Sequence, residues 1–92
     1  MEDCLFCKIR DGKIPGDIVY ENEHVLAFND TSPAAPTHIL IIPKEHISTL
    51  NDLEEDHKEI IGEIFLAAKE IAAKKGFAES GYRTVFNCNG HG

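Results

Sequence analysis

The chain has 92 residues and a net charge of −7, which argues against a nucleic-acid partner because such a partner needs a basic surface. Its hydrophobic share of 42% argues against disorder, and its length predicts a single domain over residues 1–92 with a modest core. Apolar runs such as residues 39–42 are too short to span a membrane, and the acidic N-terminus lacks a signal-peptide stretch. We therefore expect a cytoplasmic protein without a membrane segment.

Turn residues divide the first half of the chain into short elements. Residues 4–10 predict one or two helical turns, ended by Asp11-Gly12. Three short β-rich stretches bounded by turn residues then predict strands: 18–21, 25–28 and 38–42. The first two predicted strands form a hairpin, and two prolines fix the loop at residues 31–36. The third is continuously apolar, so we expect it to be buried on both faces.

The clearest predicted element is a helix over residues 53–75. Its apolar residues recur at helical spacing and form one stripe: Ile60, Ile61, Ile64, Phe65, Ala68, Ile71 and Ala72. Asp52 and Glu55 have the spacing of an N-terminal capping box. Gly76 is typical of the residue that ends a helix.

Residues 82–88 predict a fourth strand, followed by a glycine-rich loop at residues 89–92. Strands before and after one long helix indicate an α+β fold. A glycine loop after a strand normally leads into another element, so we expect a further strand in the intact domain.

Three cysteines, an odd number, argue against a disulfide framework in a cytosolic protein. Cys4 and Cys7 form a C-x-x-C pair, and two thiolates at this spacing can bind one tetrahedral zinc. Cys88 stands alone, so the remaining ligands would be histidines, and His46 is the candidate because it follows a strand end. Two alternatives stay open. The cysteines can be small buried apolar residues, or a redox pair, although the βαβ context of such pairs is missing.

Polar residues at the ends of predicted strands are the other candidates. His38 opens a strand after the fixed loop, where it is either a positioned functional side chain or a core histidine with a satisfied hydrogen bond. Asp30 either caps a turn or accepts hydrogen bonds from the hydroxyl pair of a ligand. Asn87 and Asn89 either form turn contacts or donate to a phosphate.

Three stretches of the chain resemble the histidine-triad (HIT) family, and its Hint-like branch in particular. They read CLFCKIRDGKIP, VYENEHVLAFNDTSPAAPTHILIIPKEHI and GYRTVFNCN, and the similarity extends from Cys4 to about Gly90. The resemblance implies a five-stranded antiparallel sheet, of which four strands would lie in these residues, with one long helix and a short N-terminal helix. It implies a homodimer that binds a purine nucleoside monophosphate or its conjugates. It also implies hydrolysis or transfer at the α-phosphorus through a nucleotidyl-histidine intermediate.

The resemblance also assigns roles to individual residues. Phe6 and Phe28 match positions that line the base pocket. Asn29, Asp30 and Thr31 match the segment that contacts the ribose, and Asp30 is the acceptor for its hydroxyls. His38 matches a histidine that supports the triad from a neighbouring strand, and Asn87 matches a polar residue near the phosphate. The zinc ligands that the family pattern implies are Cys4, Cys7 and His46, with the first histidine of the triad as the fourth.

The chain departs from the family pattern in one respect, since it contains no His-x-His-x-His motif. Beyond Asn87 the single histidine is His91, which lies in the glycine-rich loop. We therefore expect these residues to be a shortened form that lacks the nucleophile, the fourth zinc ligand and the last strand. Two other functions stay open, a non-catalytic nucleotide-binding module and a zinc-stabilised interaction domain.

Overall fold

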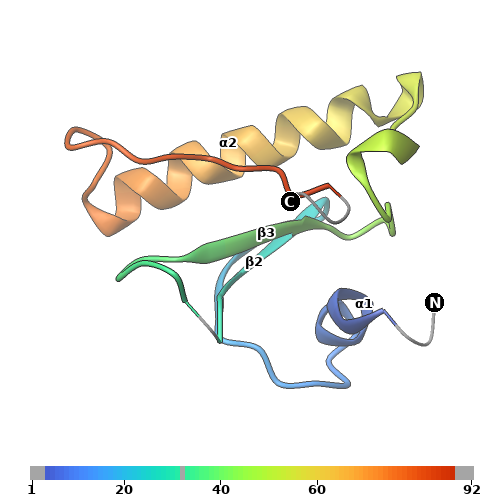
Figure 1. Cartoon of the computed structure of the whole chain (residues 1–92), viewed down its shortest axis with the longest axis horizontal. Coiled ribbons are helices and arrows are strands. Elements are labelled where there is room, and N and C mark those ends of the chain that lie inside the picture. Colours follow the sequence, from blue (N-terminus) through green and yellow to red (C-terminus); the bar gives the residue numbers. More distant parts are fainter. Residues whose placement is uncertain (1–3, 32, 89–92) are drawn as a thin grey trace.

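The computed structural model describes residues 4–31 and 33–88. The chain forms a central sheet with one helix on each side (Figure 1). Its elements in chain order are α1 (Leu5–Arg10), β1 (Ile18–Glu21), β2 (Val25–Asn29), β3 (Ile39–Pro43), the 3-10 helices η1 (Leu50–Asp52) and η2 (Glu55–His57), and α2 (Lys58–Lys75). Helix α2 lies along one face of the sheet, and α1 lies on the other side. The predicted α+β class, with one long helix and a short N-terminal helix, is confirmed.

The three described strands form an antiparallel sheet in the order β1-β2-β3. A side-chain turn explains the hairpin between β1 and β2, because Asn22 Oδ1 accepts hydrogen bonds from the N–H groups of His24 and Val25 at 2.8 and 2.9 Å. These strands lie within one residue of their predicted bounds. The expected burial of residues 38–42 is wrong, since β3 is half-buried throughout. The most buried strand is β2, in which the first four residues are buried, because it is central in the sheet and β3 is at its edge.

Helix α2 begins later than the sequence predicts. The expected capping box, with Asp52 as N-cap and Glu55 as its partner, is wrong. The Asp52 carboxylate instead accepts a hydrogen bond from the Thr49 N–H at 3.1 Å, so Thr49 caps a 3-10 turn. The carboxylate is therefore engaged by an upstream N–H, and two short 3-10 helices precede α2. The predicted end is confirmed, because Gly76 has a left-handed φ of 86° and its N–H bonds to the carbonyls of Ala72 and Ala73.

The core lies between α2 and the sheet. The buried residues of α2 are Ile64, Ala67, Ile71 and Ala72. Ile64 and Ala67 pack with Val25 of β2 in one apolar cluster. The predicted stripe is therefore shifted, because Ala67 belongs to the core while Phe65 is 46% exposed. Phe65 lies on the flank of the helix, where its ring contacts Phe86 at a centroid distance of 5.6 Å.

The fourth strand predicted at residues 82–88 is wrong. This segment has no strand pairing in the described structure, and it runs beside α2, where Phe86 contacts Phe65 (Figure 1). The Phe86 ring gains an apolar contact with the helix, and among the described residues no strand pairs with the outer edge of β3. The predicted loop at residues 89–92, with Asn89 and His91, lies outside the described residues, as does Ser32 in the loop before β3. Within the described part of the chain, no helix is long and apolar enough to cross a membrane.

Candidate functional site

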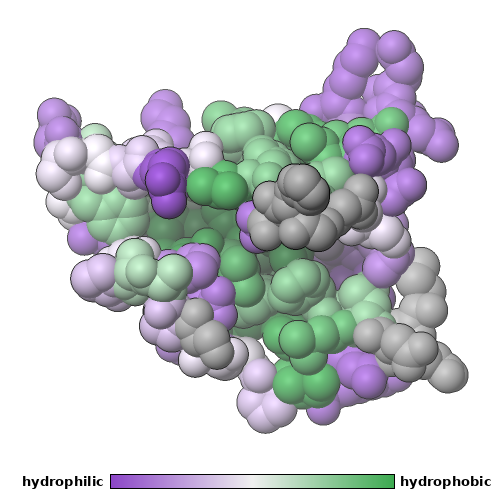
Figure 2. Space-filling model, in the orientation of Figure 1, coloured by the Kyte–Doolittle hydropathy of each residue, from purple (hydrophilic) through white to green (hydrophobic). Residues whose placement is uncertain are grey.

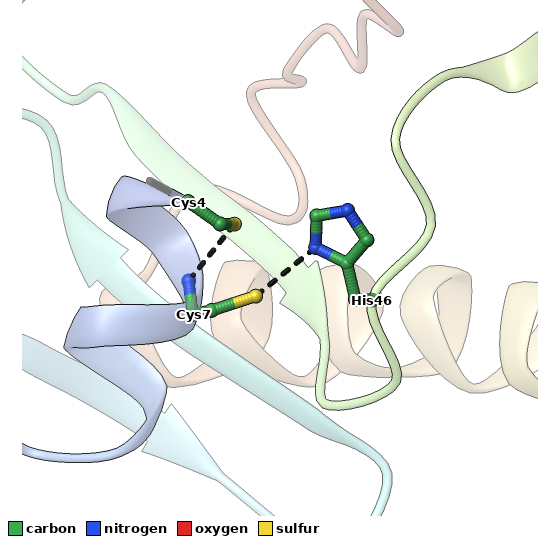
Figure 3. A group of neighbouring side chains, drawn as sticks. All are labelled: Cys4, Cys7 and His46. Carbon is green, nitrogen blue, oxygen red and sulfur yellow. Dashed lines mark hydrogen bonds between the residues drawn. The ribbon is translucent and has the colours of Figure 1, made fainter. Parts of the chain in front are cut away.

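Cys4, Cys7 and His46 converge on one point between α1 and the segment after β3. One ligand atom from each residue lies within 4.8 Å of the other two. Cys4 is the N-cap of α1, and its Sγ accepts a hydrogen bond from the Cys7 N–H at 3.2 Å. The Cys7 thiol lies 3.0 Å from Nδ1 of His46, and the three side chains point toward one another (Figure 3). The structure thus brings together three residues that are close enough to hold a metal ion.

Two hydrogen bonds hold these side chains in place. The Arg10 guanidinium donates from Nη1 to the Lys44 carbonyl at 2.6 Å, so it ties α1 to the segment that carries His46. The opposite ring nitrogen of His46, Nε2, lies 3.0 Å from the Ser48 hydroxyl. This second contact orients the ring with Nδ1 toward Cys7, as outer hydrogen bonds do for metal-binding histidines.

The donor set fits zinc. Two thiols and one imidazole nitrogen are the ligands that zinc prefers in structural sites. Ligand atoms on one tetrahedral zinc lie about 3.5–3.8 Å apart. The Cys7 Sγ and His46 Nδ1 atoms, 3.0 Å apart, would therefore have to separate slightly, while no pair of the three donors is more than 4.8 Å apart. A hydrogen bond between the two thiols lowers the pKa of Cys4 and raises the pKa of Cys7. Cys4 therefore loses its proton first, and a cation would complete the deprotonation of Cys7.

A second cluster lies where β2 ends and β3 begins. The Asp30 N–H donates to the His38 carbonyl at 2.9 Å, and the Asp30 carboxylate lies 3.5 Å from Nε2 of His38. Nδ1 of His38 accepts a hydrogen bond from the Ala34 N–H at 3.0 Å. The proton of the neutral ring is therefore on Nε2, where it faces Asp30. An open hollow beside this pair is lined by Asn29, Asp30, Pro33, Pro36, Thr37, His38 and Lys75.

Two aromatic rings lie near the metal-ligand cluster. Phe6 of α1 and Phe28 of β2 have ring centroids 6.1 Å apart and planes inclined at 46°. Phe28 is buried while Phe6 is 43% exposed, so one ring is fixed in the sheet and the other covers it from α1. Phe6 also lines the same cavity as Cys4, Cys7 and His46.

The remaining predicted site residues stand apart or have local partners. Asn29 donates from its side-chain nitrogen to the Asp17 carboxylate at 2.7 Å. Thr31 and Asn87 are exposed, and neither lines the two cavities described above. Sequence reasoning missed Arg10 and Ser48. Arg10 gave no signal because its partner is a backbone carbonyl far along the chain.

Comparisons with known proteins find similarity along almost the whole chain. The family described as "Scavenger mRNA decapping enzyme C-term binding" matches residues 3–92. The purine nucleoside phosphoramidase of Escherichia coli (strain K12) is 48% identical over 91 residues, which cover 99% of this chain and 76% of that protein. The crystal structure of a HIT family hydrolase from Legionella pneumophila Philadelphia 1 matches with a TM-score of 0.94 and 50% identity, covering 97% of this chain and 80% of that one. A histidine triad protein from Clostridium difficile matches with a TM-score of 0.95 and 44% identity, covering 99% and 79%.

The metal-ligand cluster can be tested with cobalt, which replaces zinc and reports its ligands by colour. We expect Co²⁺ to give the charge-transfer absorption of sulfur ligands, because two thiolates and His46 would surround it. The absorption should weaken in Cys7→Ser, which leaves one thiolate, and persist unchanged in Cys88→Ser, a matched control with a half-buried cysteine outside the cluster. Equal loss in both variants, or no absorption in the unmodified protein, would show that the cluster does not bind metal.

Proposed function

The chain belongs to the histidine-triad family, and we propose that it binds a purine nucleoside monophosphate or its conjugates. The observation that carries this proposal is the arrangement of Phe6 on Phe28 together with Asp30, which follows Phe28 closely at the end of the same strand. An aromatic surface suits a purine ring, and a carboxylate suits the ribose hydroxyls. The 48% identity to a purine nucleoside phosphoramidase supports this choice of ligand.

Each residue has a role in the proposed complex. Phe6 and Phe28 contact the base, and the Asp30 carboxylate accepts hydrogen bonds from the ribose, with Asn29 and Thr31 beside it. At the other end of the nucleotide, Asn87 donates to the phosphate, and His38 supports the nucleophile. His38 suits that role because Ala34 and Asp30 hold its ring and leave the proton on Nε2.

For the intact protein, we propose hydrolysis or transfer at the α-phosphorus of nucleoside phosphoramidates or similar conjugates. A histidine nitrogen attacks phosphorus, the amine leaves with a proton, and a nucleotidyl-histidine forms. Water then cleaves the bond between phosphorus and this histidine, which releases the nucleoside monophosphate. The 92 residues contain no His-x-His-x-His motif, so the nucleophile of this proposal is not among them.

We also propose that the metal is zinc, held by Cys4, Cys7 and His46, with the first triad histidine as the fourth ligand in the intact protein. The ligand chemistry and the short distances support zinc in a structural role. Bound there, zinc would hold α1 to the segment after β3. Within the 92 residues, water would have to supply the fourth ligand, and binding would be correspondingly weaker.

The ribose contact predicts a specific change in ligand preference. We expect the protein to bind AMP about tenfold or more tightly than its 2′,3′-dideoxy analogue, since a hydrogen bond to a charged group is lost in the analogue. In Asp30→Asn, calorimetry should show nearly equal affinities for the two ligands. Asp56→Asn, an exposed position in η2, should keep the preference. An unchanged preference in Asp30→Asn would remove Asp30 from the ribose site.

The chemical step requires the triad. We expect protein that includes the triad to convert adenosine phosphoramidate into AMP and ammonia, and residues 1–92 alone to form no AMP above background. His38→Ala should lower kcat by about tenfold or more, because the nucleophile loses its support. His24→Ala, in the hairpin between β1 and β2, is the matched control and should keep kcat. Failure of the triad-containing protein to release AMP would exclude this activity.

We further propose that the protein is a homodimer. Apolar residues gather on the face of the molecule shown in Figure 2. The exposed apolar residues include Phe65 and Leu66 of α2, and Val85 and Phe86 in the segment that runs beside this helix. We expect the mass of two chains in sedimentation equilibrium at micromolar concentration, and a shift toward one chain in Leu66→Glu, because it places a charge in this surface. Leu50→Glu, an equally apolar exposed position in η1, is the control. A single-chain mass for the unmodified protein would contradict the dimer.

A further inference from the structure

We propose that a metal ion bound by Cys4, Cys7 and His46 positions Phe6, so that metal occupancy and purine affinity are thermodynamically coupled. This inference rests on the proposed nucleotide function and adds a means of regulating it. Its structural basis is that Phe6 lies between the two cysteines in the C-x-x-C sequence and lines the same cavity as all three ligands. A single helical turn therefore carries two of the three metal ligands, Cys4 and Cys7, together with the ring proposed to contact the base.

Helix α1 has little apolar packing of its own. It contains six residues, far fewer than a helix needs to be stable alone. Cys7 is its one buried residue, whereas Leu5 is 55% and Phe6 43% exposed. The position of α1 consequently depends on a few tethers to the rest of the molecule.

Three contacts between protein groups tether α1. Phe6 contacts Phe28, Cys7 contacts His46, and Arg10 donates to the Lys44 carbonyl. The Arg10 bond holds the C-terminal end of α1, while the ligand cluster holds its N-terminal end. A bound metal would replace one thiol–imidazole contact with three metal–ligand bonds, and it would restrict the end of the helix where Phe6 lies.

The expected coupling is moderate. Phe28 is fixed in β2, so a shift of α1 changes the spacing between the two rings and the surface offered to a purine. Coupling between two sites in one protein is typically about 5- to 150-fold in affinity. We expect about tenfold here, toward the low end, because Arg10 and Phe28 already restrain α1 in the metal-free state. By reciprocity, a bound purine nucleoside should tighten metal binding by the same factor.

The first measurement compares metal-free and zinc-loaded protein by calorimetry, with adenosine and AMP as separate ligands. Adenosine is essential because a phosphate could bind directly to an open position on zinc, whereas adenosine has no phosphate. We expect both ligands to bind about tenfold more tightly to the zinc-loaded protein. Circular dichroism of the metal-free protein must show the helix content of the loaded form, so that lost affinity is not lost folding.

Variants separate positioning from general stabilisation. Cys4→Ser measured with zinc should bind adenosine like the metal-free protein, and Cys88→Ser should behave like the unmodified protein. Phe6→Leu should retain zinc affinity in a chelator competition but lose the tenfold difference between the loaded and metal-free forms. Arg10→Gln should increase that difference, because α1 then depends more on the metal.

The outcomes distinguish the two proposals. Equal adenosine affinities for folded metal-free and zinc-loaded protein would overturn the coupling and leave the nucleotide function standing. A zinc effect seen with AMP but absent with adenosine would also overturn it, since the phosphate would then contact the metal. Failure of zinc-loaded protein to bind either ligand would overturn the proposed nucleotide function and the coupling with it.

Discussion

The structure depends on the burial of β2 from both sides. Val25 faces α2, where it packs with Ile64 and Ala67, while Phe28 contacts Phe6 of α1 on the other side. Successive side chains of a strand point to opposite faces, so four consecutive buried residues require cover on both. Each aliphatic or aromatic side chain buried in this way contributes about 1.5–3 kcal/mol. The position of α1 is therefore linked to the centre of the sheet through one ring.

The helices on the two sides of the sheet are attached by different kinds of interaction. Helix α2 is long and packs on the sheet through apolar side chains. Apolar contacts are non-directional, so they tolerate small shifts of the helix. Helix α1 is attached mainly by directional contacts at its two ends, the Cys7–His46 contact and the bond from Arg10 to the Lys44 carbonyl. A directional contact depends on distance and angle, so ligands at these positions influence α1 far more than α2. This difference is why the side of the sheet that carries α1 is suited to a site that responds to a bound ion.

Much of this arrangement was predictable because its signals are local. The C-x-x-C pair, the turn at Asn22 and the helix end at Gly76 each depend on a few neighbouring residues. The capping box was misplaced because Thr49 and Asp52 have the same spacing as Asp52 and Glu55, and spacing alone does not show which pair bonds. Residues 82–88 have the composition of a strand. A strand also needs the free edge of another strand to pair with, and local composition does not reveal whether one is near. The role of Arg10 was out of reach because a backbone carbonyl has no sequence signature.

The proposed nucleotide site spans parts of the molecule that differ in rigidity. Its ribose end rests on Asp30 and His38, which a backbone hydrogen bond joins at the ends of β2 and β3. Its base end rests on Phe28 in the sheet and on Phe6 in a helix that is tethered by polar contacts. Movement of α1 would therefore change contact with the base while leaving the ribose contacts intact. We therefore expect the proposed site to keep its preference for a ribose when α1 moves, while the strength of purine binding would vary with the metal.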